Sequence, residues 1–214
     1  MNEQMNSVIN EVLDVYKNLG IQRLAEYQQE ILQNENFYPP TSQNLLLSAP
    51  TGSGKNLVME ILALVNVRLT GKKCIFICPY VSGCQEIFFN LQQVWREFGL
   101  NIKAHFGAVS TSPNDEFDAI VCTIEKSAPF VNRLFREDTL KDYCTVIIDE
   151  VHMLIDSDRG GHLEDLIIKL NYCKSIGRFG YDLKGITLLK FREIPQIISM
   201  SATLENPQQI CNFY

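Results

Sequence analysis

No apolar run in this sequence reaches the roughly 18 residues that a membrane-spanning helix needs, and the N-terminus lacks the basic-then-apolar pattern of an export signal. Its seven cysteines include no CxxC pair and no Cys/His cluster with metal-ligand spacing. They lie mostly in apolar runs, so we expect core thiols, a reducing intracellular compartment and no membrane partner. A surplus of basic residues is missing too. The formal net charge is −6, which argues against a protein that coats nucleic acid electrostatically but leaves room for a local basic strip.

The sequence does contain a phosphate-binding loop with one altered position. Residues 49–56 read Ala-Pro-Thr-Gly-Ser-Gly-Lys-Asn, after the apolar run 45–47 and before a helical stripe that starts at Leu57. The motif requires this context, because loop N–H groups and the helix N-terminus surround the phosphate oxygens. Lys55 is placed for the outer phosphates, whereas Asn56 stands where a Ser or Thr hydroxyl ligates Mg²⁺. The candidate nucleotide-binding residues here are Thr51, Gly52, Ser53, Gly54, Lys55 and Asn56.

Short apolar runs alternate with helical stripes along the chain. We expect strands at 45–47, 74–78, 119–122, 144–148 and 196–200, and helices at about 8–19, 24–33, 57–70, 82–98, 129–136, 160–173 and from about 207. This alternation predicts an α/β fold in which a mostly parallel sheet has helices on both faces. An N-terminal helical segment, 1–40, precedes the domain at 41–214. Ser82 and Gln85 are expected to form a capping box at the start of one helix.

One segment, 174–193, has weak periodicity and is long for a plain connection. It carries five basic residues against two acidic ones, a net charge of +3 (5 − 2). We interpret it as a solvated surface insertion, and a contact strip for nucleic acid is the alternative.

Residues with useful chemistry follow the carboxyl end of each predicted strand. These segments are 49–56, 79–81, 123–126, 149–152 and 201–203. In open parallel sheets, ligands bind outside the carboxyl ends of the strands. All five segments are therefore expected to meet at one edge of one sheet.

Two adjacent carboxylates, Asp149 and Glu150, end a strand that reads as buried on both faces. That placement is costly unless a metal or a water network uses them. Asp149, together with Asn56, suits a Mg²⁺ site, and Glu150 suits the base that orients an attacking water. His152, placed beside Glu150, is interpreted as a link from the nucleotide to the Ser-Ala-Thr triplet at 201–203. The remaining candidates, interpreted as structural, are His105, His162 and Trp95.

Together these segments resemble domain 1 of superfamily 2 helicases of the DEAD/DEAH-box type, which has a P-loop RecA-like fold. Residues 149–152, Asp-Glu-Val-His, are similar to motif II, and residues 201–203, Ser-Ala-Thr, to motif III. Finer matches point to the Ski-like branch and, within it, to the POLQ-like and polymerase-theta helicase groups. The most specific match runs from motif II to Asp-Arg-Gly at 158–160 and Leu-Glu at 163–164. The resemblance covers nearly the whole chain except the segment 174–193.

The resemblance implies the ATP-binding half of an ATP-dependent DNA helicase, with ATP and Mg²⁺ as cofactors. It further implies movement 3′ to 5′ on single-stranded DNA, a role in DNA repair or replication-fork maintenance, and a nuclear location. It places adenine reading on Gln28, in a Q motif at 24–32 with Tyr27 where Trp is usual. The implied catalytic residues are Lys55, Asp149, Glu150 and His152, and the implied coupling residues are Ser201, Ala202 and Thr203. The implied nucleic-acid contacts are Pro79, Tyr80, Val81, Ser82, Thr123, Glu125, Lys126, Arg159 and Gly160.

Two features depart from that pattern. Asn56 replaces the hydroxyl that ligates Mg²⁺, and a longer amide side chain should disturb octahedral geometry. The chain also ends soon after motif III, so we expect the second RecA-like domain, normally in cis, outside it, and we do not expect this chain alone to unwind a duplex. Two alternatives stay open. One is a catalytically degenerate module that binds nucleotide or DNA, which Asn56 favours, and the other is an RNA helicase of the same branch.

Overall fold

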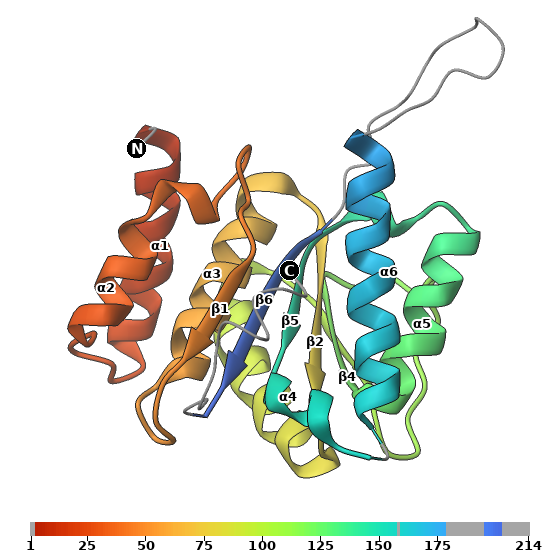
Figure 1. Cartoon of the computed structure of the whole chain (residues 1–214). Helices are drawn as coiled ribbons and strands as arrows, with labels where there is room; N and C mark the ends of the chain where they lie inside the picture. The colour runs from red at the N-terminus through yellow and green to blue at the C-terminus, as the bar shows by residue number, and fades with distance from the viewer. Residues whose placement is uncertain (1–2, 158, 179–194, 203–214) are drawn as a thin grey trace, which may run out of the picture.

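The computed structural model describes residues 3–157, 159–178 and 195–202. Its helices and strands alternate along the chain as the sequence predicts (Figure 1). In chain order they are α1 (Glu3–Asn18), α2 (Glu26–Gln33), η1 (Glu35–Phe37), β1 (Leu45–Ser48), α3 (Lys55–Thr70), β2 (Lys73–Cys78), α4 (Val81–Trp95), η2 (Arg96–Phe98), β3 (Ile102–His105), β4 (Ala119–Thr123), α5 (Ile124–Arg136), η3 (Leu140–Asp142), β5 (Tyr143–Ile148), η4 (Val151–Ile155), α6 (Gly160–Arg178) and β6 (Gln196–Ser201). The helix expected from about residue 207 lies outside the described residues.

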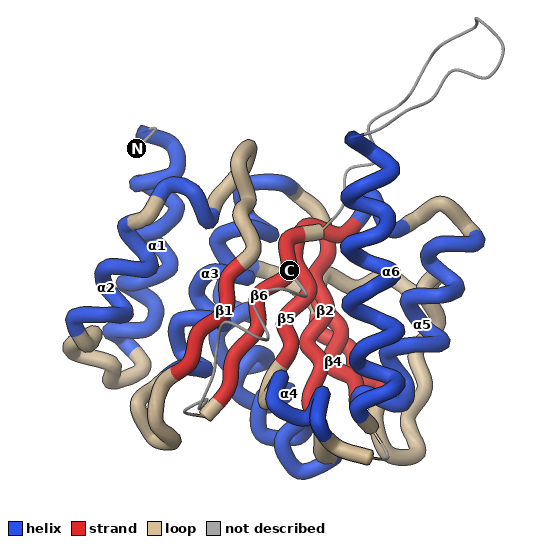
Figure 2. The backbone as a smooth tube through the Cα atoms, in the orientation of Figure 1, coloured by secondary structure: helices blue, strands red, loops and turns tan. Residues whose placement is uncertain are grey.

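The strands form one sheet in the order β1-β6-β5-β2-β4-β3, and every pairing among them is parallel (Figure 2). Leu45 at the start of β1 lies opposite Ile198 of β6. Cys78 at the end of β2 lies opposite Thr123 at the end of β4. The predicted α/β fold with a parallel sheet is therefore confirmed, and the carboxyl ends of the strands share one edge.

Each face of the sheet packs into its own hydrophobic core. Side chains alternate along β2, so that Cys74, Phe76 and Cys78 enter one core while Ile75 and Ile77 enter the other. The first core includes α1, α2, α3 and α4, and the second includes α5, η4 and α6. Helices thus cover both faces, and the sheet is held between them.

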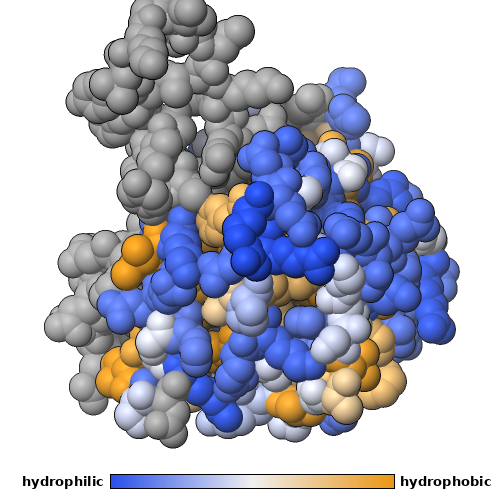
Figure 3. Space-filling model, turned by 90° about the vertical axis from the view of Figure 1, so that its right-hand side faces the viewer, coloured by the Kyte–Doolittle hydropathy of each residue, from blue (hydrophilic) through white to orange (hydrophobic). Residues whose placement is uncertain are grey.

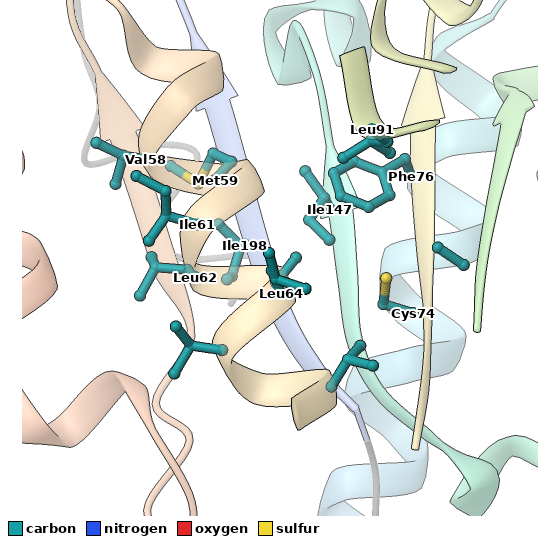
Figure 4. Close-up of a cluster of buried hydrophobic side chains, with 14 of the residues drawn as sticks. Val58, Met59, Ile61, Leu62, Leu64, Cys74, Phe76, Leu91, Ile147 and Ile198 are labelled. Atoms are coloured by element: carbon teal, nitrogen blue, oxygen red, sulfur yellow. The ribbon is translucent and has the colours of Figure 1, made fainter. Parts of the chain in front are cut away.

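Helix α3 is buried on nearly every side, because α1 and α2 cover the side that faces away from the sheet (Figure 1). Every residue from Val58 to Val67 is buried. Leu64 points toward the sheet near Ile147 and Ile198 (Figure 4). A helix that is apolar all round is one that must be enclosed, so the N-terminal segment belongs to the same packed body as the sheet.

Several local expectations differ from the structure. The edge strand β3 was not expected, because Ile102–His105 is short and carries the exposed Lys103. Helix α5 begins at Ile124 rather than near Pro129, which lies inside the helix. The Ser82–Gln85 capping box is wrong: α4 begins at Val81, its N-cap is Tyr80, and no side chain caps it.

The segment 174–193 is described only as far as Arg178, and residues 174–178 continue α6. The surface over α5 and α6 is mostly hydrophilic with scattered apolar side chains (Figure 3). Within the described ranges, no helix combines the length and hydropathy that crossing a bilayer requires.

Candidate nucleotide and nucleic-acid site

The phosphate loop connects β1 to α3 at the carboxyl edge of the sheet. Gly52 and Gly54 have φ angles of +78° and +87°, in the left-handed region that favours glycine. The backbone N–H of Ser53 donates to the Pro50 carbonyl at 3.2 Å. The Ser53 Oγ atom is buried and has no hydrogen-bond partner among the described residues. A donor without a partner beside two left-handed glycines fits a ligand rich in acceptor oxygens, such as a phosphate chain.

Lys55 is the first residue of α3 and is only 7% exposed. Its Nζ atom donates to the carbonyl oxygens of Ala49 at 2.8 Å and Pro50 at 3.1 Å. The ammonium group therefore lies within the curve of the loop, where the outer phosphates are expected. Asn56 follows at the second helical position and is half-buried.

Two side chains of α2 hold the phosphate loop from the N-terminal side. The Tyr27 hydroxyl donates to the Ser53 carbonyl at 2.7 Å, and Gln28 Nε2 donates to the Gly54 carbonyl at 2.9 Å. Gln28 Oε1 in turn accepts from the Ala25 N–H at 2.8 Å. A Cβ atom on Gly54 would lie 2.7 Å from Gln28 Nε2, so this close approach requires glycine. The sequence places Gln28 in the site, but its contact with the loop and the role of Tyr27 come from the structure.

The start of α2, which carries Tyr27 and Gln28, borders an open hollow of about 680 Å³. The residues that line it are Arg23, Leu24, Ala25, Glu26 and Gln29. The hollow lies at the start of the segment 24–32, for which the sequence predicts a Q motif.

Asp149 ends β5 next to the loop, and its backbone N–H donates to the Ile77 carbonyl at 2.8 Å. Burial raises the pKa of the Asp149 carboxyl to about 6, and the charge of Glu150 adds to the rise. The Glu150 N–H and the Lys55 ammonium act in the opposite direction. A desolvated carboxylate of this kind gains from a nearby cation.

The half-buried carboxyl of Asp149 is the type of oxygen ligand that Mg²⁺ uses in nucleotide-binding sites. Among the residues that the structure describes, no three or more His, Cys, Asp or Glu side chains are grouped so as to hold a metal. Mg²⁺ usually binds through one or two protein oxygens together with substrate phosphates and waters. Asp149 and the amide oxygen of Asn56 would supply the protein oxygens, and the ion would carry positive charge to the phosphates.

Glu150 and His152 connect the end of β5 to the end of β6. Glu150 has a φ of +52°, a conformation that costs a non-glycine residue energy and that clusters at functional sites. Its Oε2 atom lies 3.1 Å from His152 Nδ1 and accepts from the Ala202 N–H at 3.3 Å. His152 Nδ1 also lies 3.0 Å from Ser201 Oγ. Since a carboxylate oxygen only accepts, the proton between Glu150 and His152 belongs to Nδ1.

The second half of the edge carries the ends of β2 and β4, where α4 and α5 begin. Tyr80 and Val81 are 53% and 41% exposed. Thr123 is buried and is the N-cap of α5, without a side-chain cap bond. Two helix N-termini therefore share this edge, and their free N–H groups favour negatively charged ligands.

Three further predicted residues are already engaged within the protein. Lys126 Nζ donates to the Val109 carbonyl at 2.6 Å and to Ser110 Oγ at 3.3 Å. Arg159 Nε lies 2.8 Å from Glu125 Oε1. Gly160 is buried, and a Cβ atom there would lie 2.4 Å from the Leu154 carbonyl oxygen, so the start of α6 needs glycine for packing. Their direct contact with nucleic acid remains a prediction.

Comparison with known proteins gives this arrangement a family. A profile of the DEAD/DEAH box helicases matches residues 25–210. The chain belongs to the DEAD/DEAH box helicase family. Its sheet with helices on both faces is the RecA-like α/β domain expected of that family.

Three relatives of this helicase domain cover most of its length. DNA polymerase theta of Mus musculus is 38% identical over 205 residues, which is 94% of this chain and 8% of that protein. Helicase POLQ-like of Homo sapiens is 30% identical over 212 residues, 97% of this chain and 17% of that protein. ATP-dependent DNA helicase Hel308 of Methanococcus vannielii is 30% identical over 210 residues, 94% of this chain and 24% of that protein. The chain therefore spans less than a quarter of each of these relatives.

The strand order explains how the helicase motifs divide along the edge. β6, which leads to motif III, lies between β1 of the phosphate loop and β5 of motif II. β2 and β4, which lead to the segments at 79–82 and 123–126, lie on the other side of β5. Of motif III, the structure describes Ser201 and Ala202, whereas Thr203 lies outside the described residues.

One segment in the second half of the edge was not expected from the sequence. Residues 106–111 follow β3 and reach both neighbouring segments, since Lys126 donates to Val109 and a Cβ on Gly107 would lie 3.8 Å from Val81 Cγ1. Only the position of Gly107, with a φ of +56°, hints at a turn there. Because the preceding strand was not recognised, nothing in the sequence pattern placed these residues at the carboxyl edge.

Proposed function

We propose that this chain is the ATP-binding half of an ATP-dependent DNA helicase that translocates on single-stranded DNA and serves DNA repair or replication-fork maintenance. The observation that carries this proposal is the contact of Glu150 with His152 and the Ala202 N–H. It joins the carboxylate best placed for hydrolysis to the segment that a second domain would move against. The relatives include an ATP-dependent DNA helicase, Hel308 of Methanococcus vannielii, which supports the DNA assignment.

The residues around the phosphate loop and the end of β5 would each have a separate role in ATP binding and hydrolysis. Lys55 would exchange the carbonyl oxygens of Ala49 and Pro50 for phosphate oxygens, which are stronger acceptors for an ammonium group. Asp149 in its ionised form and Asn56 would hold Mg²⁺, which supplies charge to the phosphates. Glu150 would accept a proton from the attacking water and orient it. A second RecA-like domain, normally in cis, would complete the cleft.

The protein carries an overall negative charge, so contact with nucleic acid through backbone amides and hydroxyls suits it better than contact through many lysines. The N-termini of α4 and α5 offer backbone N–H donors to phosphates without a need for many lysines. These donors lie around Val81 and Ser82 and at Thr123 and Ile124. A nuclear location follows from the proposed action on DNA.

Calorimetric titration of the chain with ATP, in Mg²⁺ and then in EDTA, tests the nucleotide half. We expect binding that requires Mg²⁺ and that Lys55→Ala abolishes. The alternative of a degenerate module, which Asn56 favours, predicts binding that is equal in Mg²⁺ and EDTA, or no binding. Either of those results would contradict the proposal.

Asn56→Thr probes the altered position directly. Loss of a metal-site partner costs about 10- to 100-fold in metal affinity or activity, so restoring the hydroxyl should strengthen Mg²⁺-dependent ATP binding by about tenfold. Asn56→Ala is the matched control, because it removes the amide without adding a hydroxyl and should weaken Mg²⁺-dependent binding further. An unchanged affinity in both variants would place the metal elsewhere.

The same motifs also occur in RNA helicases of this branch, so DNA must be distinguished from RNA. The longer native protein should hydrolyse ATP faster with oligo(dT) than with oligo(U) of the same length. Equal or greater stimulation by oligo(U) would reject the DNA assignment while leaving the helicase family unaffected.

A further inference from the structure

The guanidinium group of Arg159 lies where three helices begin. Arg159 immediately precedes Gly160, the first residue of α6. Its Nε atom lies 2.8 Å from Oε1 of Glu125, in the first turn of α5. Its Cζ atom lies 4.7 Å from the ring centroid of Tyr80, the N-cap of α4. One side chain thus contacts residues at the starts of two other helices, and those two helices follow β2 and β4.

The backbone around Arg159 is itself held firmly. Its N–H donates to Asp156 Oδ1 at 2.9 Å, and the Gly160 N–H donates to the Asp156 carbonyl at 3.0 Å. Gly160 packs so closely against Leu154 that no side chain fits there. The hydrogen bonds to Asp156 and the packing of Gly160 therefore determine the direction in which the Arg159 side chain leaves the backbone.

We propose that Arg159 is a positioning residue that sets the spacing between the segments 79–82 and 123–126, rather than a residue that binds nucleic-acid phosphates itself. This inference rests on the proposed function for its nucleic-acid measurement. Its charge is already neutralised by Glu125, and one face of its planar group lies against the Tyr80 ring. Arginine suits this task because its planar fork pairs with a carboxylate and stacks on an aromatic ring at the same time.

The two roles for Arg159 predict opposite effects at Glu125. If Arg159 bound a phosphate, Glu125→Gln would release the guanidinium group and remove a negative charge, so nucleic-acid binding would tighten. If Arg159 fixes the spacing, Glu125→Gln and Arg159→Gln both break the ion pair between Arg159 and Glu125, and nucleic-acid binding weakens in both variants. The double variant Glu125→Gln/Arg159→Gln should then be no weaker than Arg159→Gln alone, because the ion pair is lost only once.

The experiment measures fluorescence anisotropy of labelled oligo(dT) with the whole chain. From the usual strengths of an exposed ion pair and a cation–π contact, we expect binding about five- to tenfold weaker for each single variant. The dependence of affinity on salt should keep its slope, whereas loss of a direct phosphate contact would lower that slope by about one.

Arg133→Gln is the matched control. Arg133 Nε lies 2.7 Å from Glu137 Oε1, with exposures of 38% and 36% that resemble the 31% and 45% of the Arg159–Glu125 pair. It lies near the far end of α5 and should leave oligo(dT) binding within about twofold of native, as is usual for an exposed pair. Tighter binding by Glu125→Gln, or equal losses for Arg133→Gln and Arg159→Gln, would overturn the inference.

Hydrogen exchange tests the positioning role of Arg159 without nucleic acid. Arg159→Gln should speed amide exchange in both segments, 79–82 and 123–126, and leave exchange in α1 unchanged. Unchanged exchange in both segments would overturn the inference, whatever the anisotropy shows. If the native chain binds no oligo(dT) but exchange responds as expected, the nucleic-acid part of the proposed function fails and the positioning role stands. ATP affinity in calorimetry should be the same for all these variants.

Discussion

Glu60 of α3 is the acidic side chain that the described part of the fold buries, at 6% exposure. The Tyr16 hydroxyl of α1 donates to its Oε2 atom at 3.4 Å, a long hydrogen bond. Burial raises the pKa of Glu60 to about 8, the hydrogen bond from Tyr16 opposes the rise, and Glu86 of α4 adds to it. Burial also raises the pKa of Tyr16. Glu60 is therefore protonated near neutral pH, and the N-terminal helix packs against a neutral acid.

This pKa gives the stability of the protein a defined pH dependence. The folded pKa of about 8 lies above the ordinary value of 4.5, so the folded state keeps a proton that the unfolded state releases. Stability therefore falls as pH rises from about 4.5 to about 8 and then levels off. Glu60→Gln keeps an acceptor for the Tyr16 hydroxyl and removes the titrating group. At about pH 9, its free energy of unfolding in urea should therefore exceed that of the native chain by roughly 2–4 kcal/mol.

The matched comparison is Glu86→Gln, which removes an exposed carboxylate of α4. It should change the pH dependence of urea unfolding far less than Glu60→Gln does. A Glu60→Gln variant whose stability follows the same pH curve as the native chain would show that Glu60 is ionised in the fold.

The positions of the candidate catalytic residues could be predicted from the sequence, whereas the side chains that hold the neighbouring segments in place could not. Lys55, Asp149 and Glu150 lie where the loop and strand patterns put them. The Tyr27 hydroxyl and the Arg159 guanidinium act on segments that are distant in sequence. No local pattern carries such a contact, because it depends on how the helices pack.

At the scale of elements, the phosphate loop depends on the short helix α2. Tyr27→Phe removes the hydrogen bond to the Ser53 carbonyl and keeps the ring. Since a neutral hydrogen bond contributes about 1 kcal/mol, we expect ATP affinity in calorimetry to fall about fivefold. The loss should appear in the affinity because the loop is less well ordered before ATP binds.

Tyr38→Phe is the control for this change. The Tyr38 hydroxyl donates to the Leu32 carbonyl at 2.8 Å, in the same N-terminal segment but away from the loop. It should lower the melting temperature at least as much as Tyr27→Phe and leave ATP affinity unchanged. Equal ATP affinities for the two variants would mean that α2 does not order the loop.

The start of α6 provides a second prediction at this scale. Gly160 and Gly161 are neighbours in the first turn, but only at Gly160 would a Cβ atom meet backbone, 2.4 Å from the Leu154 carbonyl oxygen. Gly160→Ala should therefore lower the free energy of unfolding by about 2 kcal/mol or more. Gly161→Ala meets nothing within 4 Å and should raise it by about 0.5–1 kcal/mol. Urea unfolding of the two variants checks whether the free energy of unfolding falls for Gly160→Ala and rises for Gly161→Ala. A Gly160→Ala variant as stable as the native chain would contradict this packing.

Two elements show why local patterns gave incomplete boundaries. Pro129 suggested a helix start, yet α5 begins at Ile124 because Ile124, Ala128 and Val131 are buried against the sheet. The edge strand β3 escaped notice because an edge position tolerates the exposed Lys103. The start of α5 and the position of β3 both depend on which neighbouring elements pack against them, and a single sequence does not show that packing.

At the scale of the whole molecule, a buried polar network ties together segments that local reasoning left separate. Asn66 Nδ2 of α3 donates to Gln196 Oε1 of β6 at 2.9 Å. Gln196 Nε2 donates to the carbonyl oxygens of Phe37 and Gln43. The two side chains are 1% and 2% exposed. The network therefore ties the connection before β1 to helix α3 and to the start of β6.

Asn66→Ala should lower the free energy of unfolding by about 2–3 kcal/mol, because it leaves a buried amide oxygen without its partner. Gln196→Ala should have a similar cost, and the double variant should cost at least about 1 kcal/mol less than the sum. Asn101→Ala, which removes an exposed amide bound to the Glu116 carbonyl, is the control and should cost less. Additive losses in urea unfolding would show that the two amides act independently.

The strand order also has a consequence for how the protein acquires its nucleotide site during synthesis. β1, which leads to the phosphate loop, has no other strand partner in the described sheet than β6, and Leu45 pairs with Ile198. The ribosome delivers residues 45–195 before that partner exists. A nascent chain that has not yet exposed β6 can pair β2 with β4 and β5, but its phosphate loop is attached to an unpaired strand. The phosphate loop is thus expected to reach its final position only when β6 inserts between β1 and β5.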